Sequence, residues 1–421
     1  MNVAVLGGGL SGLACLSELR RKGIDAFLLE AQSAAGGLAK TALINGYTYD
    51  LHGGHVFNSK HKEVRDWVFS RLPEEAWESS PRVAKIHHAD RLISYPFEYA
   101  LWELPADIAA DCIVDLAASR KGPEPAVFGD WLVWAFGRRI AQEYLLPYNR
   151  KIWRYDLSKM SSHWVQGKMP IPTLREVLLA VLRRDANESE MPHSLYYYPK
   201  SGGIQSLVDA IATPHSNHIL LNSPVERIEK EGDCWIINGT YKATHVLSTI
   251  PLDRLMGCFP EVPAEVLRAS GRLNHNPLTT VLCRRSRPAY LSWLYLPSPE
   301  FLCHRIVYQG ELSSGCCPPG AVSATYEATR SASAEEVLKG MPDRTTCPEA
   351  AYDEVLGQSY TEYAYPVYDI DSERNLGMVN SWLDGTGIRR CGRFAEWRYY
   401  NMDICIKRAL ETLNDLMSLV S

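Results

Sequence analysis

The chain carries little excess charge of either sign and no long apolar run. Its formal net charge is −5 over 421 residues, which gives no support for a nucleic-acid partner. The longest apolar stretch, residues 100–118, is broken by four carboxylates, so no membrane-spanning helix and no membrane partner are expected. The contents of hydrophobic (46%) and charged (22%) residues are ordinary and fit a globular protein of two or three domains.

Cysteine is abundant, but it does not occur in any ligand spacing. None of the 11 cysteines belongs to a C-x-x-C pair or to a Cys/His pattern typical of zinc, so no metal site is predicted. Cys316-Cys317 stands beside two prolines, which favours a surface loop over redox chemistry. Because no leader precedes the first predicted strand, we expect a cytoplasmic protein with reduced, mostly buried thiols.

The N-terminal stretch holds a glycine pattern typical of dinucleotide binding. The short apolar run Val3–Leu6 predicts a buried parallel strand, and residues 13–21 predict a helix. Gly7, Gly9 and Gly12 stand between them in G-x-G-x-x-G spacing. In this spacing Gly7 permits a tight turn, Gly9 lets a pyrophosphate approach the backbone, and Gly12 lets strand and helix pack closely. The first N–H groups of the helix would then face the phosphates.

Two further features strengthen this prediction. A second apolar strand, Ala26–Leu29, ends in Glu30, which is placed to accept a hydrogen bond from a ribose hydroxyl. Gly36 and Gly37 follow as a second close-approach turn. Together these features resemble the start of the flavoproteins of the amine oxidase and glutathione reductase clan, and the resemblance implies FAD, held non-covalently. No second G-x-G-x-x-G follows, which argues against a separate NAD(P)H domain.

A Gly-Gly-His turn follows the first strands. Residues 45–57 alternate like a strand and then reach Gly53, Gly54 and His55. The glycines leave room for a flat ligand beside the imidazole ring. On its own this turn favours a histidine of the core, but because it lies downstream of the predicted flavin site we interpret His55 as a flavin contact.

Residues 67–182 predict helices that are rich in aromatic residues, most of them core. Tyr148 and Trp153 are the exceptions. Pro147 is expected to interrupt the helix there, and polar groups alternate with the rings, so both side chains are predicted to line a pocket. The polar residues 158–167 predict a mobile loop.

The rest of the chain returns to strands. Gly202-Gly203 opens a predicted helix over residues 205–212. Short strands are then predicted at residues 219–221, 225–228, 235–237 and 246–250. Further strand-like runs predict an antiparallel sheet, at residues 278–283, 291–296, 306–308 and 321–326. Residues 392–403 precede a predicted C-terminal helix, whose first N–H groups would face a polar ligand edge.

Taken in order, these stretches resemble the UDP-galactopyranose mutase family, within the wider protoporphyrinogen oxidase and amine oxidase clan. The similarity is strongest at the N-terminal glycine motif and at residues 53–57, 148–153 and 392–403, the last being the most specific. It implies an α/β fold: a Rossmann-type FAD-binding domain with a helical domain and an antiparallel β-sheet substrate domain. We expect the FAD-binding domain to comprise residues 1–66, 196–260 and 371–421. The helical domain would comprise 67–195, and the sheet domain 261–370.

The resemblance also implies cofactor contacts. His55 would lie against the flavin, and Arg393 and Met402 would contact its isoalloxazine or pyrophosphate. The backbone near Val225 would meet the adenine.

On the substrate side the resemblance implies three pocket residues and three diphosphate contacts. Tyr148 and Trp153 would line the nucleotide-sugar pocket, as would Tyr196, whose alignment is looser. Arg305, Tyr365 and Tyr399 would face the diphosphate, because arginine binds it by paired hydrogen bonds and tyrosine hydroxyls add neutral donors. With His55, these three are the candidate catalytic residues.

The sequence departs from the family pattern at two places. The family has a second diphosphate arginine after the mobile loop, where this chain has Pro172. Arg175 lies three residues further on as a candidate substitute. Asn401 stands where the mutases commonly carry an acid. The substrate is therefore expected to be another nucleotide sugar or a molecule without a diphosphate.

The leading hypothesis is a FAD-dependent mutase that interconverts the pyranose and furanose forms of a nucleotide-linked sugar. In the family mechanism the N5 nitrogen of reduced flavin attacks the anomeric carbon, and the resulting flavin–sugar adduct opens and recloses as the smaller ring. The reduced form is therefore expected to be active, with NAD(P)H as one option for the electron donor.

Two rival hypotheses stay open. The first is a FAD-dependent oxidase or desaturase of the amine oxidase clan that acts on a small molecule, which the Pro172 departure favours. The second is a binding protein in which FAD is structural. The sugar, the nucleotide, the physiological reductant and the oligomeric state, for which a homodimer is one option, are left open by the sequence.

Overall fold

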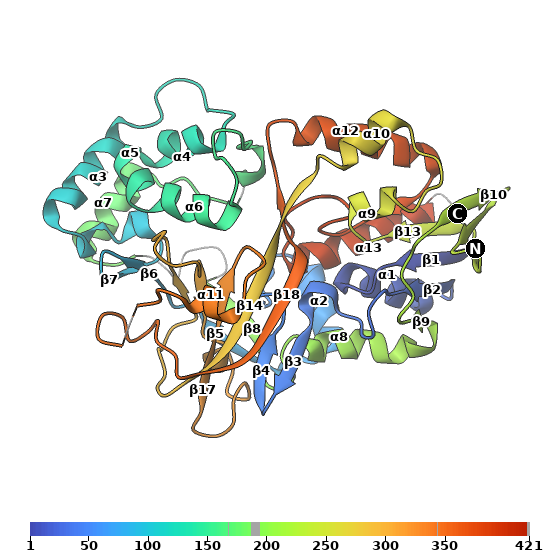
Figure 1. The fold of residues 1–421 in the computed structure, drawn as a ribbon, viewed down its shortest axis with the longest axis horizontal. Helices are drawn as coiled ribbons and strands as arrows, with labels where there is room; N and C mark the ends of the chain where they lie inside the picture. Colours follow the sequence, from blue (N-terminus) through green and yellow to red (C-terminus); the bar gives the residue numbers. More distant parts are fainter. Residues whose placement is uncertain (167, 187–193, 343, 419–421) are drawn as a thin grey trace.

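A five-stranded parallel sheet lies on the side of the molecule that holds both chain ends (Figure 1). The computed structural model describes residues 1–166, 168–186, 194–342 and 344–418. The sheet has the order β19-β13-β1-β2-β9. Its strands are β1 (Asn2–Leu6), β2 (Asp25–Leu29), β9 (Ile219–Leu220), β13 (His245–Ser248) and β19 (Arg389–Arg390). The sheet is thus assembled from three distant stretches of the chain.

The central strand β1 is buried on both faces, which explains its unbroken apolar run. Val3 and Val5 pack with one group of helices, namely α1 (Leu10–Arg21), α8 (Gln205–Ala212) and α13 (Met402–Ser418). Ala4 and Leu6 pack with another group, namely α9 (Leu252–Met256), α10 (Ala264–Ser270) and α12 (Ser372–Thr386). This is the doubly covered sheet that the Rossmann-type prediction implied, and the predicted fold class is confirmed.

The local predictions in this part of the chain hold with one exception. The helix at 205–212 is confirmed, and α1 begins three residues earlier than predicted. Residues 225–227 are not strand, and only Ile228 is, in β10 (Ile228–Glu231). The side chain of Asn238 accepts the N–H groups of Glu226 and Arg227 at 2.9 and 3.1 Å, and so replaces strand pairing there. β10 then pairs with β11 (Cys234–Ile237), and β11 with β12 (Tyr241–Ala243).

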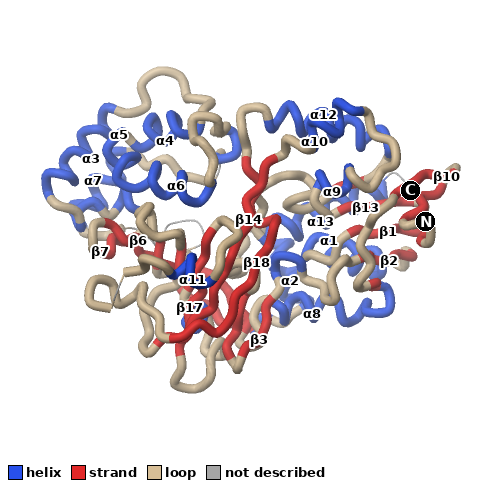
Figure 2. Tube along the Cα trace, viewed as in Figure 1, coloured by secondary structure: helices blue, strands red, loops and turns tan. Residues whose placement is uncertain are grey.

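A seven-stranded sheet in the order β18-β14-β17-β16-β15-β6-β7 forms the second part of the molecule. Its strands are β18 (Glu354–Val367), β14 (Asn274–Arg285), β17 (Val322–Ala328), β16 (Arg305–Val307), β15 (Trp293–Tyr295), β6 (Ala84–His88) and β7 (Arg91–Ser94). The long antiparallel pair β14–β18 runs through the middle of the molecule toward α10 and α12 (Figure 2). The segment predicted as helical therefore also supplies two strands of this sheet, β6 and β7, and a further strand, β5 (Trp77–Pro81), outside it.

The helices of the third part cluster beyond β6 and β7 (Figure 1). They are α3 (Ala106–Ala118), α4 (Phe128–Phe136), α5 (Arg138–Ile140), α6 (Leu146–Trp153) and α7 (Leu174–Arg183). Pro147 does not interrupt a helix, because it occupies the first turn of α6. A π-helical stretch, Ala141–Leu145, precedes it, and its wider turn accommodates the missing N–H of the proline.

The remaining elements connect these parts. They are α2 (Lys62–Arg71), α11 (Ala334–Leu338), and the strand pairs β3 (Thr41–Ile44) with β4 (Tyr47–Asp50) and β5 (Trp77–Pro81) with β8 (Leu195–Pro199). Of the helices that the structure describes, none is long and apolar enough to cross a bilayer. Over the same residues, no three His, Cys, Asp or Glu side chains gather as a metal site.

The contact between α1 and β1 predicts a stability effect. A Cβ on Gly12 would lie 1.9 Å from Gly7 O, so Gly12→Ala should push the helix from the strand and lower the free energy of unfolding by about 2 kcal/mol or more. Gly377 in α12 has nothing within 4 Å of a built Cβ. As a control, Gly377→Ala should raise the free energy of unfolding by about 0.5–1 kcal/mol. Urea unfolding measures both, and a Gly12→Ala protein as stable as the wild type would refute the close approach.

Candidate active site

The turn between β1 and α1 leaves bare backbone open to a ligand. Gly7 has a φ of 98°, and its N–H donates to Leu29 O over 2.8 Å, which ties the turn to β2. A Cβ on Gly9 would approach only the Cα of Gly37, at 4.0 Å. Gly9 and Gly37 therefore border a space without side chains. No side chain caps the first N–H groups of α1 at this place, so the turn fits a pyrophosphate.

Glu30 lies at the end of β2 with 8% of its surface exposed. Its carboxylate accepts the N–H of Gly8 over 2.6 Å and that of Gln32 over 2.8 Å. A carboxylate has about four acceptor positions, so a ribose hydroxyl can still bind. The carbonyl of Glu30 accepts the N–H of Ser223 over 2.8 Å, which brings the segment before Val225 beside it.

The turn at Gly392 and Arg393, before the C-terminal helix, lies against the N-terminal glycine turn. A Cβ on Gly392, where φ is 103°, would lie 2.7 Å from the hydroxyl of Ser11 in the first turn of α1. Arg393 follows and donates to the carbonyls of Ala364 and Tyr400. Met402 begins α13 and is partly buried. The structure thus brings the C-terminal motif onto the N-terminal glycine turn.

His55 reaches this region from the loop after β4. Its Nε2 is buried and has no hydrogen-bond partner among the described residues. Burial, with the positive charges of Arg393 and Arg305, lowers the pKa of His55 to about 3, so the ring is neutral at physiological pH. An orphaned buried nitrogen calls for a ligand atom. Together with the glycine turn, it fits bound FAD.

Arg305 is held by a carboxylate that the sequence analysis did not single out. Glu327 on β17 is fully buried. Its Oε2 accepts the Nε–H of Arg305 over 2.8 Å and forms an ion pair with Nη2 at 2.7 Å. Its Oε1 accepts the N–H of Gly54 over 2.9 Å. Burial alone would lower the pKa of Arg305, but the charge of Glu327 outweighs it and holds that pKa well above its usual range. A glutamate directly after the predicted strand 321–326 was the signal available in the sequence.

Three of the predicted aromatic residues meet beside Arg393. The rings of Tyr365 and Tyr399 stack with their centroids 5.8 Å apart, and Trp153 meets each of them edge-on at 6.3 Å. The guanidinium carbon of Arg393 lies 4.4 Å from the ring centroid of Tyr399 and 5.2 Å from that of Tyr365. Residues from α6, β18 and the C-terminal turn thus form one cluster.

Tyr148 lies near this cluster and Tyr196 does not contact it. The ring of Tyr148 lies 5.5 Å from that of Tyr295 and 6.4 Å from that of His304, beside the Arg305 strand. Tyr196 lies on β8 with 2% of its surface exposed and packs edge-on against Trp293 at 5.7 Å. No described contact joins Tyr196 to the cluster.

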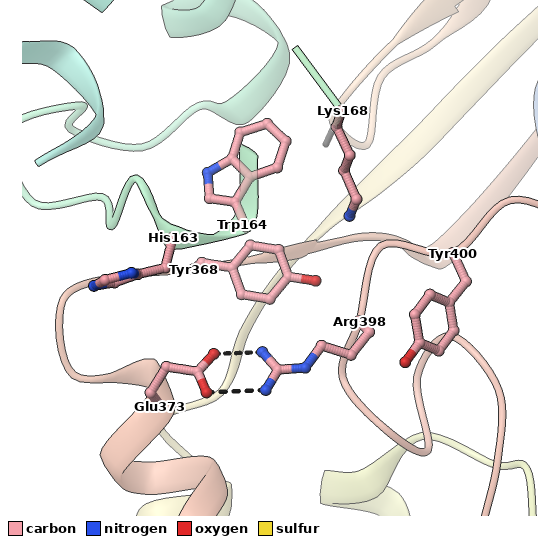
Figure 3. Close-up of a pocket in the computed structure, with 7 residues that line it drawn as sticks. All are labelled: His163, Trp164, Lys168, Tyr368, Glu373, Arg398 and Tyr400. Atoms are coloured by element: carbon pink, nitrogen blue, oxygen red, sulfur yellow. Dashed lines mark hydrogen bonds and ion pairs between the residues drawn. The ribbon is translucent and has the colours of Figure 1, made fainter. Parts of the chain in front are cut away.

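A cavity of about 470 Å³ opens beside Tyr399 (Figure 3). Its lining comprises His163, Trp164, Lys168, Tyr368, Glu373, Arg398 and Tyr400. Lys168 donates to the carbonyl of Tyr399 over 2.8 Å, and its ammonium lies 5.0 Å from that ring centroid. Figure 3 shows the Arg398 guanidinium turned to the Glu373 carboxylate, with which it pairs. Lys168 is thus a cation at the cluster that the sequence analysis missed.

The predicted second arginine is not where the family would have it. Pro172 is buried and its carbonyl accepts Arg120 Nη1 over 2.7 Å, while Arg175 is exposed in the first turn of α7. Lys168, and not Arg175, touches Tyr399. Of the predicted mobile loop, residues 158–166 are described and residue 167 lies outside the described residues.

Comparison with known families agrees with the dinucleotide turn and the flavin site. Residues 5–72 match the model of a NAD(P)-binding Rossmann-like domain, and residues 141–315 match that of the flavin containing amine oxidoreductases. Over these residues the chain is similar to both families. Among curated proteins, pseudooxynicotine dehydrogenase from Pseudomonas sp is 21% identical over 272 residues, or 60% of this chain. The matched region spans 52% of that relative, about half its length.

Solved structures share the fold over the whole chain. Reduced UDP-galactopyranose mutase superposes with a TM-score of 0.88 at 22% identity, over 99% of this chain and 96% of the other. A provisionally assigned protoporphyrinogen oxidase from Exiguobacterium sp. 255-15 has a TM-score of 0.77 at 17% identity, over 100% and 99%. At these identities the likeness shows the fold, and the resemblance drawn from the sequence is confirmed at that level.

The buried carboxyl before the His55 loop predicts a pH effect. Asp50 is 1% exposed and accepts from Thr41 and Tyr198, and burial raises its pKa to about 6. A folded-state pKa above the unfolded value stabilises the protein at low pH, and this contribution is lost as pH rises through about 6. Asp50→Asn should therefore gain stability relative to wild type between about pH 4 and pH 7, by up to about 3 kcal/mol.

Urea unfolding at several pH values measures this difference. Asp90→Asn, at an exposed position, is the control and should show no such trend. A stability difference for Asp50→Asn that does not change with pH would show that this carboxyl titrates normally.

Proposed function

We propose that this protein is a FAD-dependent mutase that interconverts the pyranose and furanose forms of a nucleotide-linked sugar. The observation that carries the proposal is the charge around the tyrosine pair. Arg305, Arg393 and Lys168 lie at this cluster. Of these three cations, only Arg305 has a carboxylate partner among the described residues. Unpaired cations attract a diphosphate and repel an ammonium group, so an anionic substrate suits the site better than an amine.

The diphosphate would be bound by Arg305, because Glu327 holds this guanidinium in one orientation and leaves its Nη1 edge to the substrate. Tyr365 and Tyr399 would add hydroxyl donors. Burial raises the pKa of Tyr365, which keeps its hydroxyl protonated as a donor. Trp153 and Tyr148 would pack against the nucleotide and sugar.

Reduced FAD, when bound, supplies the nucleophilic nitrogen that this reaction needs. The turn of Gly7, Gly9 and Gly12 would hold its pyrophosphate. His55 would hydrogen-bond to the flavin as a neutral ring, without adding a charge beside it. NAD(P)H as electron donor, a homodimer and a cytoplasmic location belong to the same proposal. The fold shared with reduced UDP-galactopyranose mutase supports it.

The proposal predicts that activity depends on the redox state of the bound FAD. A mutase consumes no net electrons, so the FAD-loaded protein should be silent when oxidised and should convert many substrate molecules after one chemical reduction. The experiment is anaerobic incubation of both forms with a panel of nucleotide sugars, with chromatographic detection of pyranose and furanose products. Bleaching of the oxidised flavin by a substrate, with no conversion by the reduced form, would overturn the proposal.

Arg305 predicts a separate effect on binding. Arg305→Lys keeps a positive charge beside buried Glu327 but loses the two-pronged geometry, so nucleotide-sugar affinity should fall by about 10- to 100-fold with FAD content unchanged. Binding is measured by calorimetry on the FAD-loaded protein. Arg183→Lys, on the exposed end of α7, is the matched control. Equal affinity in Arg305→Lys and wild type would show that this arginine does not bind the diphosphate.

A FAD-dependent oxidase acting on a small molecule is the second candidate. Two observations favour it: one curated relative is a dehydrogenase and two others are flavin-containing amine oxidases, and Pro172 replaces the family arginine. The redox experiment separates the two, because an oxidase begins its reaction from the oxidised flavin.

A further inference from the structure

The outer face of α6 borders a second cavity, of about 940 Å³. It lies between α6, the loop from β15 to β16, and the segment from the end of β17 through α11. Five basic and two acidic side chains line it: Arg150, Lys151, Arg154, Arg330 and Lys339, with Glu300 and Glu336. A basic excess in a chain whose net charge is −5 marks this cavity as different from the rest of the surface.

Most of these cations take no part in a direct ion pair. Among the described residues, the side chains of Arg150, Arg154, Arg330 and Lys339 have no hydrogen bond or ion pair. Arg154 and Arg330 are close enough that burial and then the charge of Arg330 lower the pKa of Arg154. Two guanidinium groups near each other repel, and a bound anion would reduce that repulsion.

The two acidic groups do not neutralise the cavity. Glu336 uses its carboxylate to cap α11, where it accepts the N–H of Ser333 over 2.7 Å. This cap, with the nearby charges of Arg330 and Lys339, lowers the pKa of Glu336, so one carboxylate stands against these two cations. Glu300 accepts the hydroxyl of Ser298 over 3.3 Å. The charge that remains is positive, so the cavity favours an anionic ligand.

Lys151 shapes the cavity rather than adding a free charge. Its ammonium donates to the carbonyls of Leu296 and Ser298, both over 2.7 Å, and lies 4.6 Å from the ring centroid of Phe301. These bonds fix the β15–β16 loop against α6. The loop contributes Pro297, Pro299, Phe301 and Leu302, the apolar part of the cavity lining beside the arginines. A ligand with an organic part as well as negative charge matches both walls.

From these observations we infer that the cavity binds a phosphorylated small molecule through Arg150, Arg154 and Arg330. Guanidinium groups bind phosphate oxygens in pairs, and the volume suits a ligand of nucleotide size. None of the lining residues belongs to the candidate active site. The ligand is either a separate molecule or a second copy of the phosphorylated substrate, and both share this chemistry.

The test is calorimetry on the FAD-loaded protein, with inorganic pyrophosphate and with uridine diphosphate as probes. The double variant Arg150→Ala/Arg330→Ala should lower pyrophosphate affinity by about 10-fold or more. Arg154 has a φ of 47°, so Arg154→Asn, which tolerates this backbone, is a second variant with the same expected direction. The matched control Arg138→Ala/Arg183→Ala removes two exposed arginines elsewhere and should leave affinity unchanged.

The uridine diphosphate titration separates the two sources of ligand. A second equivalent that persists in Arg305→Lys and disappears in Arg150→Ala/Arg330→Ala would show a second substrate-like molecule in the cavity. Pyrophosphate binding without that second equivalent would show a separate ligand. The inference is overturned if pyrophosphate does not bind at millimolar concentration. It is also overturned if the cavity variants and the control variant lose the same amount of pyrophosphate affinity. Sugar turnover is measured separately, so the proposed function does not fail with it.

Discussion

The buried carboxylate of Glu327 is the interaction on which the site depends. A carboxylate with no exposed surface must be paired, and this one pairs with Arg305 through a hydrogen bond and an ion pair and accepts a hydrogen bond from the backbone of Gly54. Arg305 belongs to the antiparallel sheet, and Gly54 belongs to the loop that carries His55. One buried charge therefore holds Arg305 and the loop of His55 in a fixed relation.

The long strand pair β14–β18 sets the other side of the site. Asn276 on β14 lies opposite Tyr365 on β18, and its side chain donates to the carbonyl of Trp153 at the end of α6. The end of α6 and Tyr365 are thus both held at the position of Asn276 in the sheet. This explains why Trp153 and Tyr365, more than 200 residues apart in sequence, meet edge-on.

The two faces of α6 serve different surroundings. Tyr148 and Trp153 face the candidate active site, whereas Arg150 and Arg154 face the basic cavity. Arg150 and Arg154 are four residues apart, which places them on one side of the helix end. Tyr148 and Trp153 are five residues apart, so their ring contacts with Tyr295, Tyr365 and Tyr399 place them at the candidate site, and helical spacing does not. Both faces meet positive charge, which is consistent with anionic ligands on either side of one helix.

The sequence alone was sufficient for features whose cause is local. The spacing of Gly7, Gly9 and Gly12 is typical of a dinucleotide-binding turn. The structure shows the close approach of Gly12 to Gly7 that explains the third glycine. The helix 205–212 and the strands around it follow from short-range apolar patterning. The strand expected at 225–228 was wrong because a side chain from Asn238, ten residues beyond, takes its N–H groups.

Only the tertiary structure decided which distant charges and rings meet. The sequence could not show that Glu327 would pair with Arg305, that Lys168 rather than Arg175 would touch Tyr399, or that Tyr196 would pack on Trp293 apart from the cluster. These contacts join residues from different strands, loops and helices, and the sheet register and helix packing determine their distances. A glycine turn is determined within a dozen residues, whereas the partner of a buried charge is determined by the whole fold.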